Sequence, residues 1–152
     1  MLTEKDYCDY ETCVALKELG FREKCPTYYD TEDNVGLLFN TQWTSDYLPC
    51  QFTDCLESHN SNTSDDNSYI DAPTMWEAQK WLREEKKIII EATFNLMYKG
   101  QPRFSWRVLY NLTQHKGAYY TLDSVMSKED YDSYEEALSE GVKCAVKILK
   151  EK

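Results

Sequence analysis

Two arginines on one predicted strand are the side chains best suited to bind an anion. Arg103 and Arg107 alternate with Phe104 and Trp106, so the arginines project from one face of the strand and the aromatic rings from the other. An arginine fork matches a phosphate or carboxylate group in shape and charge. Together with Tyr119 on the next predicted strand, the two arginines are candidate ligand-binding residues for an anion such as a nucleotide phosphate.

The same pattern also has a purely structural explanation. Glu91 lies on the preceding predicted strand and can share the arginine face. Opposite charges directly across a hairpin commonly form ion pairs. The two interpretations differ in whether the arginine face binds a ligand or only holds neighbouring strands together.

Metal-ligand chemistry is poorly matched by the spacing of the cysteines. Cys50, Cys55 and His59 offer three potential zinc ligands, with Cys25 as a distant fourth. Structural zinc sites favour two to four residues between paired cysteines and usually contain a second such pair. Residues 30–34 begin like a calcium loop, but a valine follows where that loop needs glycine. We therefore predict no metal and no cofactor.

The two histidines also give no indication of an active site. Neither His59 nor His115 lies in a sequence context that would orient it against a nucleophile. The glycines are isolated, so there is no phosphate-binding loop. We predict that the protein is not an enzyme, although an enzyme of unrecognised type remains an alternative if distant residues converge.

The compartment follows from the cysteines and from the first residues. Residues 1–6 lack the basic and apolar regions of a signal peptide, and no apolar run reaches the ~18 residues that span a bilayer. Without a secretory route, the six cysteines are expected to be free thiols in a reducing compartment. We expect a cytoplasmic protein with no membrane contact.

Charge is distributed unevenly along the chain. Residues 1–73 carry 15 acidic and 4 basic side chains, a net charge of -11, whereas residues 74–152 carry 12 and 13, a net charge of +1. An acidic field repels nucleic acid and attracts a basic protein. Candidate partner-binding residues are therefore Asp30, Glu32 and Asp33, with the adjacent Tyr28 and Tyr29, because tyrosine is enriched at interfaces. Solubility and strand packing are the structural alternatives.

Periodicity and capping signals predict the elements. Thr3 with Asp6 opens a helix that Gly20 ends, and Thr74 and Ser133 open two further helices with a glutamate three residues later. Alternating apolar residues predict strands. The predicted strands cover residues 26–29, 35–39, 88–94, 103–110 and 118–122.

This order of elements predicts an α+β fold. We expect a two-layer domain in which three helices pack on an antiparallel sheet of about five strands, with a three-stranded meander in the carboxy-terminal half. Gly141 lies on the apolar face of the last helix, which indicates close approach to the sheet. The chain is expected to form a single domain over residues 1–152, with residues 40–68 as a long polar loop or insertion.

Several short segments occur in an order that resembles a known group of proteins. They are Leu19-Gly20-Phe21, Cys25, Tyr28-Tyr29, Ala72-Pro73-Thr74, Trp81-Leu82-Arg83-Glu84-Glu85-Lys86 and Tyr134-Glu135-Glu136-Ala137. Their order and spacing resemble small uncharacterised proteins encoded by bacteriophages and prophages of gut bacteria. The resemblance covers most of the chain apart from residues 40–68, and it brings no catalytic residues. It implies a phage accessory protein that acts inside an infected bacterium.

Taken together, these features favour a non-enzymatic interaction protein. The expected partner is a host or phage protein, with no direct contact to nucleic acid, and a homo-oligomer is also possible. The alternative is a small-ligand binder that sequesters a nucleotide through Arg103, Arg107 and Tyr119.

Overall fold

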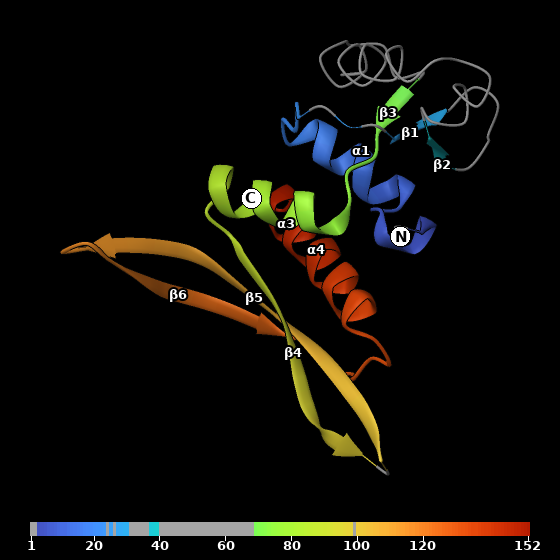
Figure 1. The fold of residues 1–152 in the computed structure, drawn as a ribbon. Coiled ribbons are helices and arrows are strands. Elements are labelled where there is room, and N and C mark those ends of the chain that lie inside the picture. The colour runs from blue at the N-terminus through green and yellow to red at the C-terminus, as the bar shows by residue number, and fades with distance from the viewer. Residues whose placement is uncertain (1–2, 24, 26, 31–36, 40–68, 99) are drawn as a thin grey trace. The chain divides into compact units, whose positions relative to one another are not determined.

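The described part of the chain forms two compact units, residues 1–74 and 75–152, where the sequence predicted one domain. The computed structural model describes residues 3–23, 25, 27–30, 37–39, 69–98 and 100–152 (Figure 1). Helices and antiparallel strands occur in both units, so the predicted α+β class is confirmed. The predicted polar loop at residues 40–68 lies outside the described residues. Each unit is described separately below.

The first helix begins later than predicted. Thr3 and Asp6 do interact, since the Thr3 backbone N–H donates to Asp6 Oδ2 at 2.6 Å, but this contact opens only a single 3-10 turn, η1 (Glu4–Asp6). Helix α1 (Tyr10–Glu18) has its own cap, Asp9, whose carboxylate accepts from the Thr12 backbone N–H. An aspartate at this position satisfies an amide that the helix leaves unpaired. Asp9 therefore sets the start of α1.

The end of α1 follows the prediction. Gly20 has a φ of 100°, which a residue with a side chain rarely adopts. The backbone N–H of Phe21 donates to the Leu16 carbonyl at 2.9 Å, and the Gly20 N–H donates to the Lys17 carbonyl at 3.1 Å. This is the paired bonding of a glycine-terminated helix. Leu16 and Phe21 are both fully buried, so the turn also anchors the unit's core.

A small antiparallel sheet completes the first unit. Strand β1 (Thr27–Asp30) pairs with β2 (Leu37–Phe39), which confirms the predicted hairpin. Its other edge pairs with β3 (Tyr69–Asp71), a short strand that the sequence did not predict. The sheet order is β2-β1-β3. The described strands thus lie in two sheets and not in the single sheet expected.

The second unit begins with a helix that is followed directly by a strand, as predicted. Helix α3 (Met75–Glu85) starts directly after Thr74. The chain leaves it through Lys87, at a φ of 55°, and the Ile88 N–H donates back to the Leu82 carbonyl. Leu82 and Ile88 are both buried. Strand β4 (Ile89–Tyr98) follows at once.

Three long strands form the sheet of the second unit, which confirms the predicted meander. Strand β5 (Gln101–His115) lies between β4 and β6 (Ala118–Met126), and both pairings are antiparallel (Figure 1). The β5–β6 turn consists of Lys116 and Gly117 alone, with φ values of 51° and 80°. Such left-handed pairs are typical of two-residue hairpin turns. His115, which lies outside the predicted strands, is the last residue of β5.

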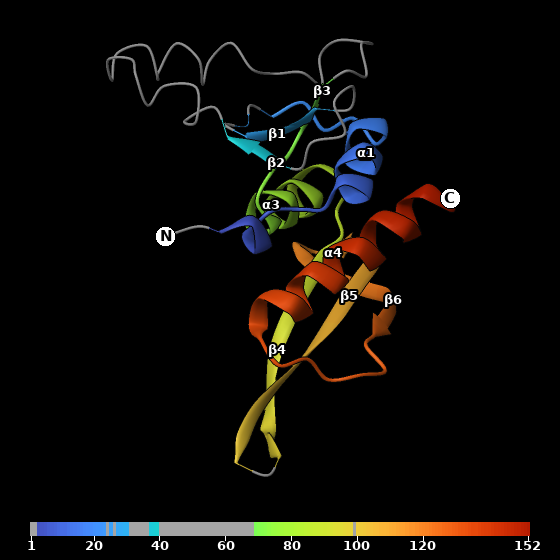
Figure 2. The same ribbon diagram turned by 90° about the vertical axis from the view of Figure 1, so that its right-hand side faces the viewer.

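Helix α4 (Tyr134–Lys150) lies along one face of this sheet (Figures 1 and 2). Its cap is the predicted one, because Ser133 Oγ accepts from the Glu136 N–H at 3.1 Å. At Gly141 a Cβ atom would lie 2.8 Å from Ile90 Cγ2 and 3.3 Å from Trp106 Cβ. The close approach expected from the glycine is therefore present. The buried residues of this face are Ala137, Leu138, Gly141, Val142, Ala145 and Val146.

Replacing Gly141 by valine should destabilise the second unit. We expect Gly141→Val to lower the free energy of unfolding by about 1–3 kcal/mol, because the added atoms overpack a close helix–sheet contact. Lys147→Val is the matched control, since residue 147 is an exposed position of the same helix and pays only the helix penalty of a branched residue, below about 1 kcal/mol. Denaturant unfolding measures both, and equal losses would contradict the close contact.

Candidate functional site

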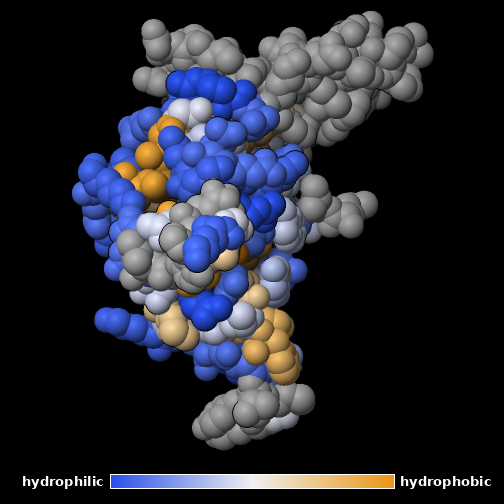
Figure 3. All heavy atoms as spheres, turned by 90° about the vertical axis from the view of Figure 1, so that its left-hand side faces the viewer, coloured by the Kyte–Doolittle hydropathy of each residue, from blue (hydrophilic) through white to orange (hydrophobic). Residues whose placement is uncertain are grey.

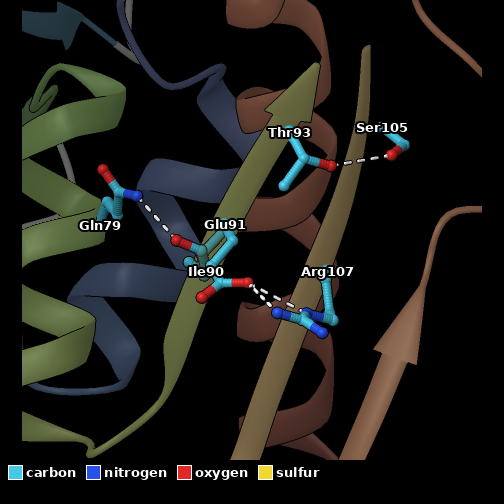
Figure 4. Close-up of polar contacts among 6 residues, drawn as sticks. All are labelled: Gln79, Ile90, Glu91, Thr93, Ser105 and Arg107. Carbon is cyan, nitrogen blue, oxygen red and sulfur yellow. Dashed lines mark hydrogen bonds and ion pairs between the residues drawn. The ribbon is translucent and has the colours of Figure 1, made fainter. Parts of the chain in front are cut away.

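The predicted arginine face is present, and Arg107 on this face forms an ion pair with Glu91. Arg107 lies opposite Glu91 in the β4–β5 register, and its Nε and Nη2 atoms donate to Glu91 Oε2 at 3.0 and 2.5 Å (Figure 4). Ile90 and Trp106, which alternate with these residues, contact α4 at Gly141. Glu91 and Arg107 therefore lie on the sheet face away from α4. Their side chains are 38% and 45% exposed.

Arg103 is also paired. Its guanidinium forms an ion pair with the Asp132 carboxylate and donates through Nη2 to the Asp130 carbonyl oxygen at 2.9 Å. Asn95, opposite Arg103 in the register, donates to Asp130 Oδ1 at 2.6 Å. These contacts hold the segment after β6 against the first half of β5, on the arginine face of the sheet.

Between the two arginines lies a row of small polar groups. The hydroxyl groups of Thr93 and Ser105 are 3.1 Å apart across β4 and β5 (Figure 4). Ser105 Oγ also donates to Asn95 Oδ1 at 3.2 Å. Both guanidinium groups on this face are thus bonded to groups of this chain. An added anion would compete with Glu91 or Asp132 for these guanidinium groups, so the geometry supports the ion-pair interpretation of the arginine face more than the ligand-binding one.

Tyr119, the third ligand-binding candidate, is a residue of β6 and pairs with Gln114 in the β5–β6 register. Its side chain lies outside the described part of the structure. Tyr119 therefore lies on β6, the strand next to β5, which carries Arg107. This backbone position does not by itself make Tyr119 a part of the arginine face.

The partner-binding candidates of the first unit are placed only in part. Tyr28 is 5% exposed, so its side chain belongs to the interior and is not available to a partner in this conformation. Tyr29 is half-buried, and its hydroxyl donates to the Cys8 carbonyl at 2.9 Å. Glu32, Asp33 and the side chain of Asp30 lie outside the described residues. The acidic cluster at residues 30–33 stays a prediction.

The described cysteines carry free thiols, as expected: Cys8, Cys13, Cys25 and Cys144. Burial raises the pKa of the Cys13 thiol well above its ordinary value, and the neighbouring Cys8 and Cys25 raise it further. Burial likewise raises the pKa of Cys144. Both thiols are therefore held in the protonated form that is a poor nucleophile.

Among the described residues, no group of three or more His, Cys, Asp or Glu side chains is arranged to hold a metal ion. Cys50, Cys55 and His59, the zinc ligands considered from the sequence, lie outside this part of the chain.

An exposed aromatic surface is the feature that sequence reasoning missed. It consists of Phe94 on β4, Phe104 opposite it on β5, and Tyr134 at the start of α4. The rings of Phe94 and Phe104 meet edge to face with centroids 5.8 Å apart, and those of Phe104 and Tyr134 do so at 6.3 Å. Phe94 is nevertheless 58% exposed and Tyr134 36% exposed. In Figure 3 a hydrophobic area borders hydrophilic surface at the height of the β4–β5 hairpin.

The surface is exposed because of where the helix begins. Phe94, Phe104 and Trp106 lie on the face that α4 covers, so alternation alone predicts that they are buried. Helix α4 begins at Tyr134, and its contact at Gly141 fixes it against Ile90 and Trp106. The β4–β5 hairpin extends past the amino-terminal end of α4, which leaves Phe94 uncovered by the helix. The Ser133 cap signalled the helix start, but only the packing register shows which ring is left uncovered.

Acidic side chains flank Tyr134 along the chain. The segment from 127 to 133 runs beside β5, since the backbones of Tyr131 and Phe104 exchange two hydrogen bonds. Trp106 Nε1 donates to the Tyr131 hydroxyl at 3.4 Å, which extends the aromatic surface under the helix. Exposed carboxylates on this segment and on the first turn of α4 are Glu129, Asp130, Asp132, Glu135 and Glu136.

Comparison with known protein families, with curated proteins and with solved structures finds no match for this chain. In the described part of the chain, none of the helices combines the length and the apolar character that crossing a bilayer requires.

Removing the Arg107–Glu91 ion pair should have only a small effect on folding. We expect Arg107→Met to lower the free energy of unfolding by about 1 kcal/mol or less, because both partners are more than one-third exposed and water screens the pair. Glu91→Gln is the matched variant of the partner residue. The double variant should lose no more free energy of unfolding than the two single variants lose together. Chemical denaturation measures the cycle. A loss above about 3 kcal/mol would contradict an exposed pair, because only a buried one is that costly to break.

Proposed function

We propose that this protein is a non-enzymatic accessory protein that binds a protein partner through its aromatic surface. The observation that carries the proposal is Phe94, a phenylalanine that is 58% exposed although its ring packs against Phe104. Fully burying such a side chain stabilises a protein by about 1.5–3 kcal/mol relative to leaving it in water. A partner that covers Phe94 gains the part of this free energy that belongs to the exposed fraction of the ring.

The geometry of the aromatic surface suits a binding role. Binding energy at interfaces is concentrated in a few aromatic side chains set in packed surroundings. The Phe104 ring is held between Phe94 and Tyr134, so the cluster is ordered before a partner arrives. An ordered surface loses less side-chain entropy on binding than a flexible one.

Charge indicates the kind of protein that binds. The carboxylates of Glu135 and Glu136 are exposed in the first turn of α4, directly after Tyr134. Such a field draws a basic protein toward the surface and raises its association rate. The partner we propose therefore presents an apolar side chain within a basic surface.

The setting we propose is a bacterial cell that carries a phage or prophage. It rests on the resemblance of the segments around Gly20, Thr74 and Tyr134 to phage-encoded proteins. The partner is then a host or phage protein in the cytoplasm. The test below does not depend on this setting.

A photo-reactive benzoyl-phenylalanine placed at residue 94 should join the partner covalently. We expect illumination of bacterial cells that make the protein to yield a discrete heavier adduct, because the exposed ring lies inside the proposed contact. Trp76 is the matched control position, since it is also an exposed aromatic residue, 36% exposed, but lies on α3. Gel shift and mass spectrometry identify the adduct.

The yield of this adduct should fall when the Tyr134 ring is removed from the aromatic surface. Tyr134→Ser should reduce the yield from residue 94, while Tyr134→Phe, which keeps the ring, should preserve it. Equal adducts from residues 94 and 76, or none from residue 94, would contradict the proposal. An adduct of twice the chain's mass would show that a second copy covers the aromatic surface, and would equally contradict a foreign partner there.

A further inference from the structure

Residues 127–133 form a strap that joins β6 to α4 (Figure 2). At the start of the strap, the Ser127 backbone N–H donates to the Trp106 carbonyl at 2.9 Å. Further along, the backbones of Tyr131 and Phe104 exchange two hydrogen bonds, at 2.7 and 2.9 Å. The strap is therefore bonded to β5 at two places along its length.

The side chains of the strap contact both faces of the sheet. The Tyr131 hydroxyl accepts from Trp106 Nε1 at 3.4 Å, on the face that α4 covers. The next side chain, Asp132, forms an ion pair with Arg103 on the opposite, arginine face. Consecutive side chains of an extended chain point to opposite sides. The strap around Tyr131 is thus held from both faces of the sheet.

Arg103 makes two contacts with the strap through one guanidinium group. One nitrogen pairs with the Asp132 carboxylate, and Nη2 donates to the Asp130 carbonyl oxygen at 2.9 Å. These two acceptors belong to the residues on either side of Tyr131. Because the guanidinium group is a rigid planar fork, it fixes both acceptors relative to β5 at once. Arg103 therefore clamps the part of the strap that lies nearest to α4.

The strap ends where the aromatic surface begins. Ser133 caps α4, and Tyr134, the first residue of the helix, places its ring 6.3 Å from that of Phe104. Only Ser133 separates Tyr134 from Asp132 in the sequence. The Gly141 contact holds α4 seven residues further on, about 10 Å along the helix axis. Because helix ends fray, the first turn of α4 depends on the strap for its position.

We propose that Arg103 is the positioning residue of the aromatic surface, and that it acts on Tyr134 through the strap from the opposite face of the sheet. This role rests on the proposed function, since the surface that Arg103 orders is the one that the partner binds. Arg107 lies on the same strand and the same face, but it pairs with Glu91 of β4 and not with the strap. The two arginines therefore have different roles.

An ordered Tyr134 ring favours partner binding because the Phe104 ring lies between Phe94 and Tyr134. When the strap is loose, the Tyr134 ring loses its fixed edge-to-face contact with Phe104. The partner must then order the ring on binding, which costs conformational entropy. Loss of the Arg103 clamp thus weakens binding without removing any atom of the aromatic surface.

The proton resonances of the Tyr134 ring test the positioning without a partner. Its edge-to-face contact with Phe104 shifts these resonances away from those of free tyrosine. We expect Arg103→Met to move them toward the free values and Arg107→Met, the matched control, to leave them in place. Amide exchange at Tyr131 should become about tenfold faster or more in Arg103→Met, since hydrogen bonds to charged groups are strong. Unchanged Tyr134 resonances in Arg103→Met, or equal changes in both variants, would overturn the proposal.

Replacing Asp132 tests the same clamp from the strap and does not depend on how the Arg103 variant folds. The Asp132 side chain is 78% exposed, so Asp132→Ala leaves the core intact. We expect Asp132→Ala to move the Tyr134 resonances in the same direction as Arg103→Met. Arg103→Lys, which keeps the charge but not the fork, should move them less than Arg103→Met. Tyr134 resonances that stay in place in Asp132→Ala would overturn the role of the ion pair.

The photo-reactive residue at position 94 connects the clamp to partner binding. Arg103→Met should lower the yield of the adduct severalfold, and Arg107→Met should leave the yield unchanged. A full yield in Arg103→Met would overturn the role of Arg103 in binding. If the wild-type surface gives no adduct, the proposed function fails, while the Tyr134 resonances still decide whether Arg103 positions the ring.

Discussion

The close contact between α4 and the sheet at Gly141 is the constraint on which the second unit depends. A helix can approach a sheet to the point where a Cβ would lie 2.8 Å from Ile90 only if the helix has no side chain there. That contact decides which face of the sheet is covered, and it places Ile90 and Val108 in the core. It also fixes how far along the strands the helix extends. The buried core and the exposed aromatic surface are therefore consequences of one packing register.

The sheet face away from α4 carries ion pairs. Charges that strand alternation places away from α4 find partners across the sheet, Arg107 with Glu91 and Arg103 with Asp132. These pairs neutralise the face where an anion site was considered. What the second unit presents to other molecules is instead a set of exposed aromatic rings, a feature that recognises proteins by shape and apolar contact.

Much of this fold could be predicted from the sequence, because the informative residues act locally. A serine three residues before Glu136 and a glycine before Phe21 set helix ends through bonds within one turn. Strand alternation correctly separated Arg107 from Trp106. The α1 start was wrong because two capping signals compete, and Asp9 caps the longer helix. The strand β3 was missed because its three residues gain their order from pairing with β1, which is distant in sequence.

The candidate site was predictable to a smaller extent. The Arg107–Glu91 pair could be expected from cross-strand register, whereas the exposure of Phe94 depends on where α4 begins relative to the β4–β5 hairpin, which is set by tertiary packing and has no local signal. Hydrogen exchange of the intact protein tests the central packing claim most directly. The account predicts that the amides of residues 137–146 share one slow exchange rate with those of Ile90 and Val108, since helix and sheet open together. Fast exchange throughout α4 beside a protected sheet would contradict it.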